Sequence, residues 1–306
     1  RAVEARLSDA LHQKLTERFI NRRTAVLMRK LGTDAGLLSV RLEDQEVLVE
    51  GEHIGSLRGF SFQVDPGARL SDRKLLLAAA ERHLPALLER RVTQVIEEMN
   101  AGTANLVLNA GAIFLDGERV AQIVPNRPPL FPQLQLEKAL NDVPTEARKH
   151  LLTTAEAWLE ALIQPLAPLR RIDEASRSTE AGPELRALLI ALVEQGGMME
   201  REGSRLDLLD KEQRTRLAKI GVKVGTLDIY VPAMLRPESI RLWRNLKGMA
   251  ATEDGLIDTM PPTLPASKNQ RPRGYRSLGK QWIRLDMAEK ILREAHAARV
   301  PAARRP

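Results

Sequence analysis

The segment from Thr259 to Leu285 gathers the side chains most able to do chemistry, because it carries six cations and no carboxylate. The cations are Lys268, Arg271, Arg273, Arg276, Lys280 and Arg284, with Tyr275 and Trp282 between them. Lys and Arg neutralise phosphates and release bound counterions, and an aromatic ring face can stack an unpaired base. We therefore expect nucleic-acid binding here. The alternative is a flexible, solubilising loop whose aromatic rings pack on the core.

A second basic cluster lies in the amphipathic stretch from Leu7 to Leu31, which predicts a long N-terminal helix. Leucines recur every four residues along one face, while Arg18, Arg22 and Arg29 follow another face. These arginines are a second candidate for phosphate contact. In the alternative interpretation they only flank a buried helix face, with their aliphatic stems packed along it.

Residues Gly274 to Gln281, GYRSLGKQ, differ at one position from the phosphate-binding P-loop pattern GxxxxGK[ST]. That motif requires a hydroxyl after the lysine to bind Mg²⁺, a buried strand before it and a helix after it. Gln281 replaces the hydroxyl, and polar SKNQRPR precedes the motif. We therefore interpret this segment as a basic loop, and a nucleotide hydrolase built on it is the weakest functional hypothesis.

Residues 173–176, DEAS, similarly imitate the DEA(D/H) motif, which positions a metal ion and a water molecule. They follow a polar, basic sequence instead of a buried strand, and they precede the P-loop lookalike, which reverses the usual order. The breaks at Pro165 and Pro168 favour a solvated turn here.

No complete catalytic constellation is found in the sequence. The chain has no cysteine, which excludes disulfides and thiolate chemistry, and its five histidines lack metal-ligand spacing. A GxSxG nucleophile elbow is also absent. We predict a chain without catalytic residues and without a cofactor or metal of its own.

Composition indicates a folded, basic protein. Lys and Arg exceed Asp and Glu by 47 − 40 = 7, which favours a polyanionic partner. Since no apolar run approaches about 18 residues and no signal peptide opens the chain, we expect a cytoplasmic protein without a membrane span.

An internal repeat organises the first half of the chain. Residues Val40 to Leu57 match Leu106 to Ile123 at a constant offset of 66 positions. Each copy contains a Gly-Glu pair, Gly51-Glu52 or Gly117-Glu118, and the short apolar runs around it predict a β-meander. Asp116-Gly117 predicts a two-residue hairpin turn. Helices are expected over about 71–99 and 145–163, one after each meander.

The second half is expected to be mostly helical. Pro183 and Pro237 suit helix starts, Asp210 with Gln213 resembles a capping box, and Asp286 suits the cap of a last helix. Between these helices the pattern predicts one strand over 222–231 and a long loop over 248–280.

The predicted fold class is therefore α+β and helix-rich. It has a long N-terminal helix, two tandem β-meander-plus-helix units and a mainly helical C-terminal part. The expected domains are a connector helix (1–35), the duplicated β-meander/helix region (36–143), a helical region with a short strand (144–250), and the basic loop with the terminal helix (251–306).

Three stretches resemble a known family: LTERFINRRTAVLMRKL from Leu15, GVKVGTLDIYVPAMLRPE from Gly221 and GYRSLGKQWIRLDMAEKIL from Gly274. They are similar to the region C-terminal to the motor of bacterial DExH helicases related to the mitochondrial degradosome RNA helicase. The resemblance implies an accessory segment that guides nucleic acid, with the opening helix as the connector leaving the motor. ATP and Mg²⁺ are then expected only for motor domains in the same polypeptide, whose ATPase residues have no positions here.

The leading hypothesis is thus a noncatalytic C-terminal region of an ATP-dependent helicase that binds and guides RNA or single-stranded DNA. The alternative is a protein-interaction scaffold in which the meanders offer sheet edges or apolar faces to a motor domain or another partner.

Overall fold

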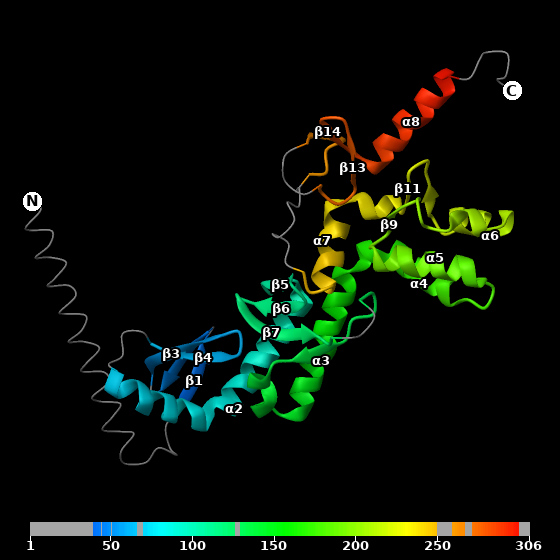
Figure 1. Cartoon of the computed structure of the whole chain (residues 1–306). Helices are drawn as coiled ribbons and strands as arrows, with labels where there is room; N and C mark the ends of the chain where they lie inside the picture. Colours follow the sequence, from blue (N-terminus) through cyan, green and yellow to red (C-terminus); the bar gives the residue numbers. More distant parts are fainter. Residues whose placement is uncertain are drawn as a thin grey trace, which may run out of the picture. The chain divides into compact units, whose positions relative to one another are not determined.

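The computed structural model describes residues 39–43, 45–49, 51–65, 70–125, 129–249, 259–266 and 271–299. The predicted N-terminal helix, with Arg18, Arg22 and Arg29, lies outside the described residues, as does Lys268. The chain divides into two compact units, the first ending at residue 158 and the second built mainly from residues after it (Figure 1). Short segments at 109–111 and 123–133 also belong to the second unit.

The first meander consists of β1 (Val40–Glu43), β2 (Glu46–Val49), β3 (Glu52–Arg58) and β4 (Ser61–Val64). Its strands pair in sequence order, each antiparallel to the next. The long helix α2 (Leu70–Ala101) follows it, close to the predicted range, although Pro85 lies inside the helix.

The second meander repeats the first, strand for strand. It consists of β5 (Leu106–Asn109), β6 (Ala112–Leu115), β7 (Glu118–Ile123) and β8 (Leu134–Leu136), again paired in sequence order. A 3₁₀ turn, η1 (Lys138–Asp142), leads into helix α3 (Thr145–Leu162), which matches the predicted range.

The two meanders also share an irregularity in strand pairing. The register between β2 and β3 shifts between Val47 and Leu48, and that between β6 and β7 shifts between Ile113 and Phe114. These positions are related by the same offset of 66, so each meander carries a β-bulge at the equivalent place. The duplication therefore preserves local geometry as well as apolar pattern.

The turn of the second meander joins the two copies within the first unit. Asp116 accepts hydrogen bonds from Gln45 of the first meander at 3.0 Å and from Arg91 of α2 at 3.2 Å. Arg91 is only 1% exposed, and its guanidinium also pairs with Glu98 at 3.0 Å. A buried arginine needs such partners, because an unpaired charge away from water is costly.

The second unit combines five helices with two small sheets among its described residues. The helices are α4 (Ala167–Arg177), α5 (Pro183–Glu194), α6 (Lys211–Lys219), α7 (Pro237–Leu246) and α8 (Leu285–Arg299). Three 3₁₀ turns accompany them: η2 (Gln164–Leu166), η3 (Leu206–Leu208) and η4 (Pro232–Leu235).

Both sheets of the second unit are antiparallel and three-stranded. One has the order β10-β11-β9, from β10 (Lys223–Val224), β11 (Asp228–Tyr230) and β9 (Met198–Glu200). The other has the order β12-β14-β13, from β12 (Thr263–Pro265), β14 (Gln281–Arg284) and β13 (Tyr275–Leu278).

The predicted fold class is wrong, because the C-terminal part is not mainly helical. The described chain is mixed α/β, with seven α-helices and four small sheets, two of which lie in the second unit. The strand predicted over 222–231 is two strands joined by a turn, and the loop predicted over 248–280 contains β12 and β13. Strands of two to four residues are too short to show an alternating pattern.

The DEAS segment is also placed differently from the prediction of a turn. Residues 173–176 belong to helix α4, which begins at Ala167, after Pro165, and has Pro168 in its first turn. Proline is favoured there because its missing N–H would have no partner in the first turn. Among the described residues, no helix is long and apolar enough to cross a membrane.

Candidate nucleic-acid interface

The segment that resembles a P-loop forms a β-hairpin. Tyr275–Leu278 pairs with Gln281–Arg284, and Gly279 and Lys280 form the two-residue turn between them. A phosphate-binding loop requires a helix N-terminus directed at the ligand, and this backbone supplies a strand instead. Residues 275–284 are thus two strands and a turn, whereas Arg271 and Arg273 precede β13 outside any strand.

Arg276 uses its charge within the fold. Its Nε and Nη2 donate hydrogen bonds to the two carboxylate oxygens of Asp228, at 2.8 and 3.0 Å. Nη2 also donates to the carbonyl of Leu227 and lies 3.7 Å from Glu200. The bond to Asp228 raises the pKa of Arg276. This side chain fixes β13 against β11, and it is not available to a phosphate.

Arg284 likewise pairs with a carboxylate of the fold, at the junction of β14 and α8. It donates to both carboxylate oxygens of Asp286 at 2.7 and 2.9 Å, and to the carbonyl of Met260 at 2.7 Å. The hydrogen bond from Arg284 lowers the pKa of Asp286 below its ordinary value of 3.8. Asp286 also accepts from the backbone N–H of Met287.

The two aromatic residues of the basic segment are buried. Tyr275 is 3% exposed and Trp282 9%, and the Tyr275 hydroxyl donates to the carbonyl of Pro261 at 2.6 Å. Burial raises the pKa of the Tyr275 hydroxyl. Both side chains are almost fully buried, as in the alternative interpretation of this segment, which leaves little of either ring exposed for a base to stack on.

Of the predicted cations that the structure describes, three are exposed: Arg271, Arg273 and Lys280. Arg271, with 46% of its side chain exposed, lies 3.5 Å from the carboxylate of Glu200. Lys280 lies in the hairpin turn. The structure thus separates the predicted set into arginines that stabilise the fold and cations that can reach a ligand.

Arg271 and Arg273 line a cleft of about 490 Å³ in the second unit, whereas Lys280 does not. Its polar lining includes Lys247, Arg244, Glu194, Glu200 and Asp228. The remaining walls are mostly apolar and come from four methionines, Trp243, Tyr275, Ile240, Leu285 and two prolines. We call this hollow the basic cleft.

Glycines allow the walls of the basic cleft to approach closely. A Cβ at Gly196 would lie 2.5 Å from Nε1 of Trp243, and one at Gly274 would lie 2.7 Å from the Cε of Met260. Both residues have positive φ, a conformation that favours glycine. Gly196 therefore does more than end α5, because its missing Cβ makes room for the indole of Trp243.

Sequence reasoning missed the α7 side of the cleft. Lys247 directly follows α7, is exposed, and has its ammonium 5.7 Å from the centroid of the Trp243 ring. A lysine four positions after a tryptophan contacts its ring only if the helix that carries the tryptophan extends to the lysine or to the residue before it, and the sequence does not show that α7 extends that far. The methionines Met198, Met249 and Met260 come from three separate segments, so no local pattern could have grouped them.

Among the described residues, no group of three or more His, Asp or Glu side chains could hold a metal ion.

Comparison with models of known protein families, with curated proteins and with solved structures finds no match.

Proposed function

We propose that this chain is a noncatalytic nucleic-acid-binding region, and that the basic cleft binds the backbone of RNA or single-stranded DNA. One observation carries the proposal: Lys247, Arg271 and Arg273 lie together on a cleft whose lining is divided about equally between polar and apolar surface. A single-stranded nucleic acid has the same division, with phosphates on one side and bases on the other.

The charges of the cleft support an anionic ligand. Asp228 is neutralised by Arg276, and Glu200 lies between Arg271 and Arg276 at 3.5 and 3.7 Å. Of the three carboxylates on the cleft, two are thus already faced by arginines. Lys247, Arg271 and Arg273 are all exposed, so an incoming phosphate can pair with them and release counterions.

The size of the cleft supports a small unit of such a ligand. Pockets of about 300 to 1,000 Å³ hold small molecules, and 490 Å³ lies within that range. Methionine side chains adapt to flat or irregular ligands because they are unbranched and polarisable. An unpaired base can therefore enter the apolar part while its phosphate remains with the cations.

The experiment is a binding titration with a fluorescent single-stranded oligonucleotide of about 15 nucleotides, measured by anisotropy at low salt. Lys247→Ala/Arg271→Ala/Arg273→Ala is expected to weaken binding by about tenfold or more. The matched control, Arg58→Ala/Arg90→Ala/Lys138→Ala, removes the same charge from exposed positions of the first unit. Equal loss in both variants, or no binding by the wild type, would refute the proposed site.

We further propose that the chain belongs to a helicase whose motor binds ATP and Mg²⁺, in keeping with the three stretches quoted above. Only the sequence resemblance supports this step. The coding sequence upstream of Arg1 tests it: two motor domains are expected there, and an unrelated or absent upstream domain would contradict it.

A further inference from the structure

A second hollow lies in the second unit, between α6 and the hairpin of α4 and α5, with a volume of about 750 Å³. Its lining comes from Ala175, Ser178, Glu180, Ala181, Leu185, Leu189, Lys211, Glu212, Thr215, Arg216, Lys219 and Ile220. We call it the α5–α6 groove. It shares no lining residue with the basic cleft, so the proposed nucleic-acid site does not explain it.

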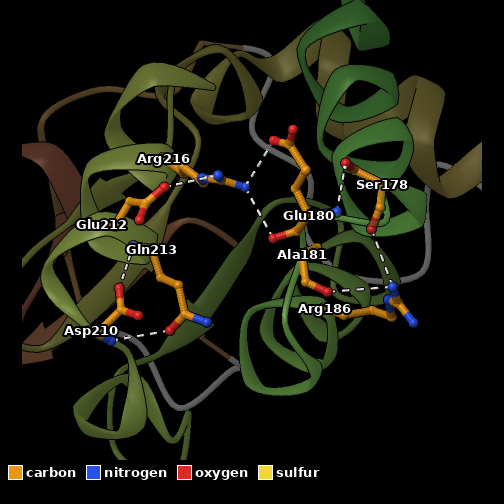
Figure 2. A network of polar contacts seen from close by, with 8 residues as sticks. All are labelled: Ser178, Glu180, Ala181, Arg186, Asp210, Glu212, Gln213 and Arg216. Carbon is orange, nitrogen blue, oxygen red and sulfur yellow. Dashed lines mark hydrogen bonds and ion pairs between the residues drawn. The ribbon is translucent and has the colours of Figure 1, made fainter.

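Arg216 holds the two walls of the groove together (Figure 2). Its Nη1 donates to the carbonyl of Glu180 at 3.0 Å and lies 3.1 Å from the Glu180 carboxylate. Its Nη2 donates to Glu212 at 2.9 Å. One arginine of α6 therefore spans to the α4–α5 connection and engages both carboxylates that line the groove.

Hydrogen bonds inside each wall of the groove also hold that wall in place. Arg186 donates to the carbonyls of Ser176, Ser178 and Ala181 at 3.1 to 3.3 Å, which sets the path of the α4–α5 connection. On the other side, Asp210 and Gln213 form a reciprocal capping box at the start of α6 (Figure 2). A groove with walls held in this way loses little conformational entropy when it is filled.

The groove combines an aliphatic base with positive charge along α6. Leu185 and Leu189 of α5 are almost fully buried at its base, and Ala175 and Ile220 are half-buried beside them. Lys211, Thr215 and Lys219 recur every four residues, so they share one face of α6. Both lysines are exposed and have no ion pair among the described residues.

We propose that the α5–α6 groove docks an acidic amphipathic helix from a partner protein. Lys211 and Lys219 are eight residues apart on α6, about 12 Å along the helix axis, which is also the spacing of carboxylates at positions i and i+8 of a docked helix. Aliphatic side chains of that helix would pack over Ala175 and Ile220 and along the stems of the lysines. None of the described residues that line the groove is aromatic, which favours an aliphatic ligand over a nucleic-acid base.

The test uses the full chain and a phage-displayed library of random peptides, followed by anisotropy of the enriched peptides after synthesis. We expect amphipathic sequences with Glu or Asp flanking an aliphatic stripe. Lys211→Glu/Lys219→Glu is expected to weaken their binding by about tenfold or more, since it places like charges across the interface. Lys223→Glu/Lys138→Glu makes the same charge change away from the groove and is expected to leave binding unchanged.

A second variant separates loss of charge from loss of shape. Thr215→Arg adds bulk beside the groove while raising its positive charge, so it is expected to weaken docking although the electrostatic attraction increases. Circular dichroism of each variant checks that α6 remains folded.

Three outcomes would overturn the proposal. The first is that the library yields no acidic amphipathic peptides. The second is that Lys211→Glu/Lys219→Glu binds the enriched peptides as tightly as the wild type does. The third is that this variant loses affinity for the oligonucleotide but keeps its affinity for the peptides. The last result would assign the groove to nucleic acid.

Discussion

Arginines of the same sequence segment have different roles, and their partners decide which. Arg276 and Arg284 each form two hydrogen bonds to a carboxylate, whereas Arg271 faces Glu200 at a longer distance and remains largely exposed. A bidentate pair is short and well oriented, and breaking it leaves a carboxylate without its partner. The exposed arginine can exchange its partner for a phosphate at low cost.

Removal of the Glu200 charge is expected to tighten oligonucleotide binding. Glu200→Gln keeps the size of the side chain but removes the anion that competes with phosphate for Arg271. We expect a gain of about two- to fivefold in anisotropy titrations, corresponding to the modest energy of an exposed pair. Glu202→Gln, an exposed acid that does not line the cleft, is the control. A weaker affinity in Glu200→Gln would show that Glu200 supports the site instead of competing for it.

Arg276→Met is expected to lower the free energy of unfolding by about 2 kcal/mol, because Asp228 is buried and would lose its bidentate partner. Urea denaturation followed by circular dichroism measures this change. Lys280→Met removes a cation from the neighbouring hairpin turn and is expected to have an effect below about 0.5 kcal/mol. Equal effects of the two substitutions would mean that the Asp228 pair contributes nothing to stability.

At the scale of elements, the two meanders are the most regular feature of the chain. Gly51 and Gly117, equivalent positions in the repeat, have φ values of +81° and +84°, and neither has another atom near its missing Cβ. Gly55 differs from its equivalent Ala121, since a Cβ at Gly55 would lie 2.2 Å from the carbonyl oxygen of Gln63. The equivalent turns thus have the same backbone conformation, whereas the packing around Gly55 differs from that around the equivalent Ala121.

These glycines give a prediction about the repeat. Gly51→Ala and Gly117→Ala are each expected to cost about 1 kcal/mol of stability, from backbone strain alone. Gly55→Ala is expected to cost more, because the backbone atoms around it must move. Chemical denaturation of the three variants checks the order, and a Gly55→Ala variant as stable as the other two would contradict it.

The junction of β14 and α8 should be sensitive to acid. Arg284 lowers the pKa of Asp286 below 3.8, so the pair stabilises the fold above that pH and stops doing so as the pH falls through the lowered value. The difference in stability between wild type and Arg284→Met is expected to be below about 1 kcal/mol near neutral pH and to narrow at about pH 2. Urea titrations at the two pH values measure it. A difference that widens in acid would contradict the proposed pairing.

Much of the element order could be predicted from sequence, for reasons visible in particular residues. The ranges of α2 and α3 and the helix starts at Pro183 and Pro237 are confirmed, as is the Asp210–Gln213 capping box, because caps and long apolar periods are local signals. The sheets of the second unit were missed because their strands are short and paired by distant residues. The contact of Arg276 with Asp228 joins positions 48 residues apart.

The site was less predictable than the fold. Composition identified a basic segment, but local sequence cannot distinguish an arginine that holds a strand from one that meets solvent. The burial of Tyr275 and Trp282 depends on packing that involves the whole second unit. Lys247 became a candidate only through its place on the cleft.

At the scale of the whole molecule, a net charge of +7 fits an anionic partner, but the arrangement of charge carries more information than its sum. Among the hollows of the second unit, one is a cleft rich in methionine that carries cations, and another is an aliphatic groove beside two lysines. We propose nucleic acid for the first and an acidic helix for the second, which would let one unit bind both partners.

The salt dependence of oligonucleotide binding tests the central claim most directly. For three phosphates neutralised by Lys247, Arg271 and Arg273, the logarithm of the association constant should fall with the logarithm of salt concentration with a slope of about −2. The triple alanine variant should flatten that slope towards zero, while the charge-matched variant of the first unit retains it. No detectable binding at low salt, or an unchanged slope in the cleft variant, would contradict the assignment of the basic cleft to nucleic acid.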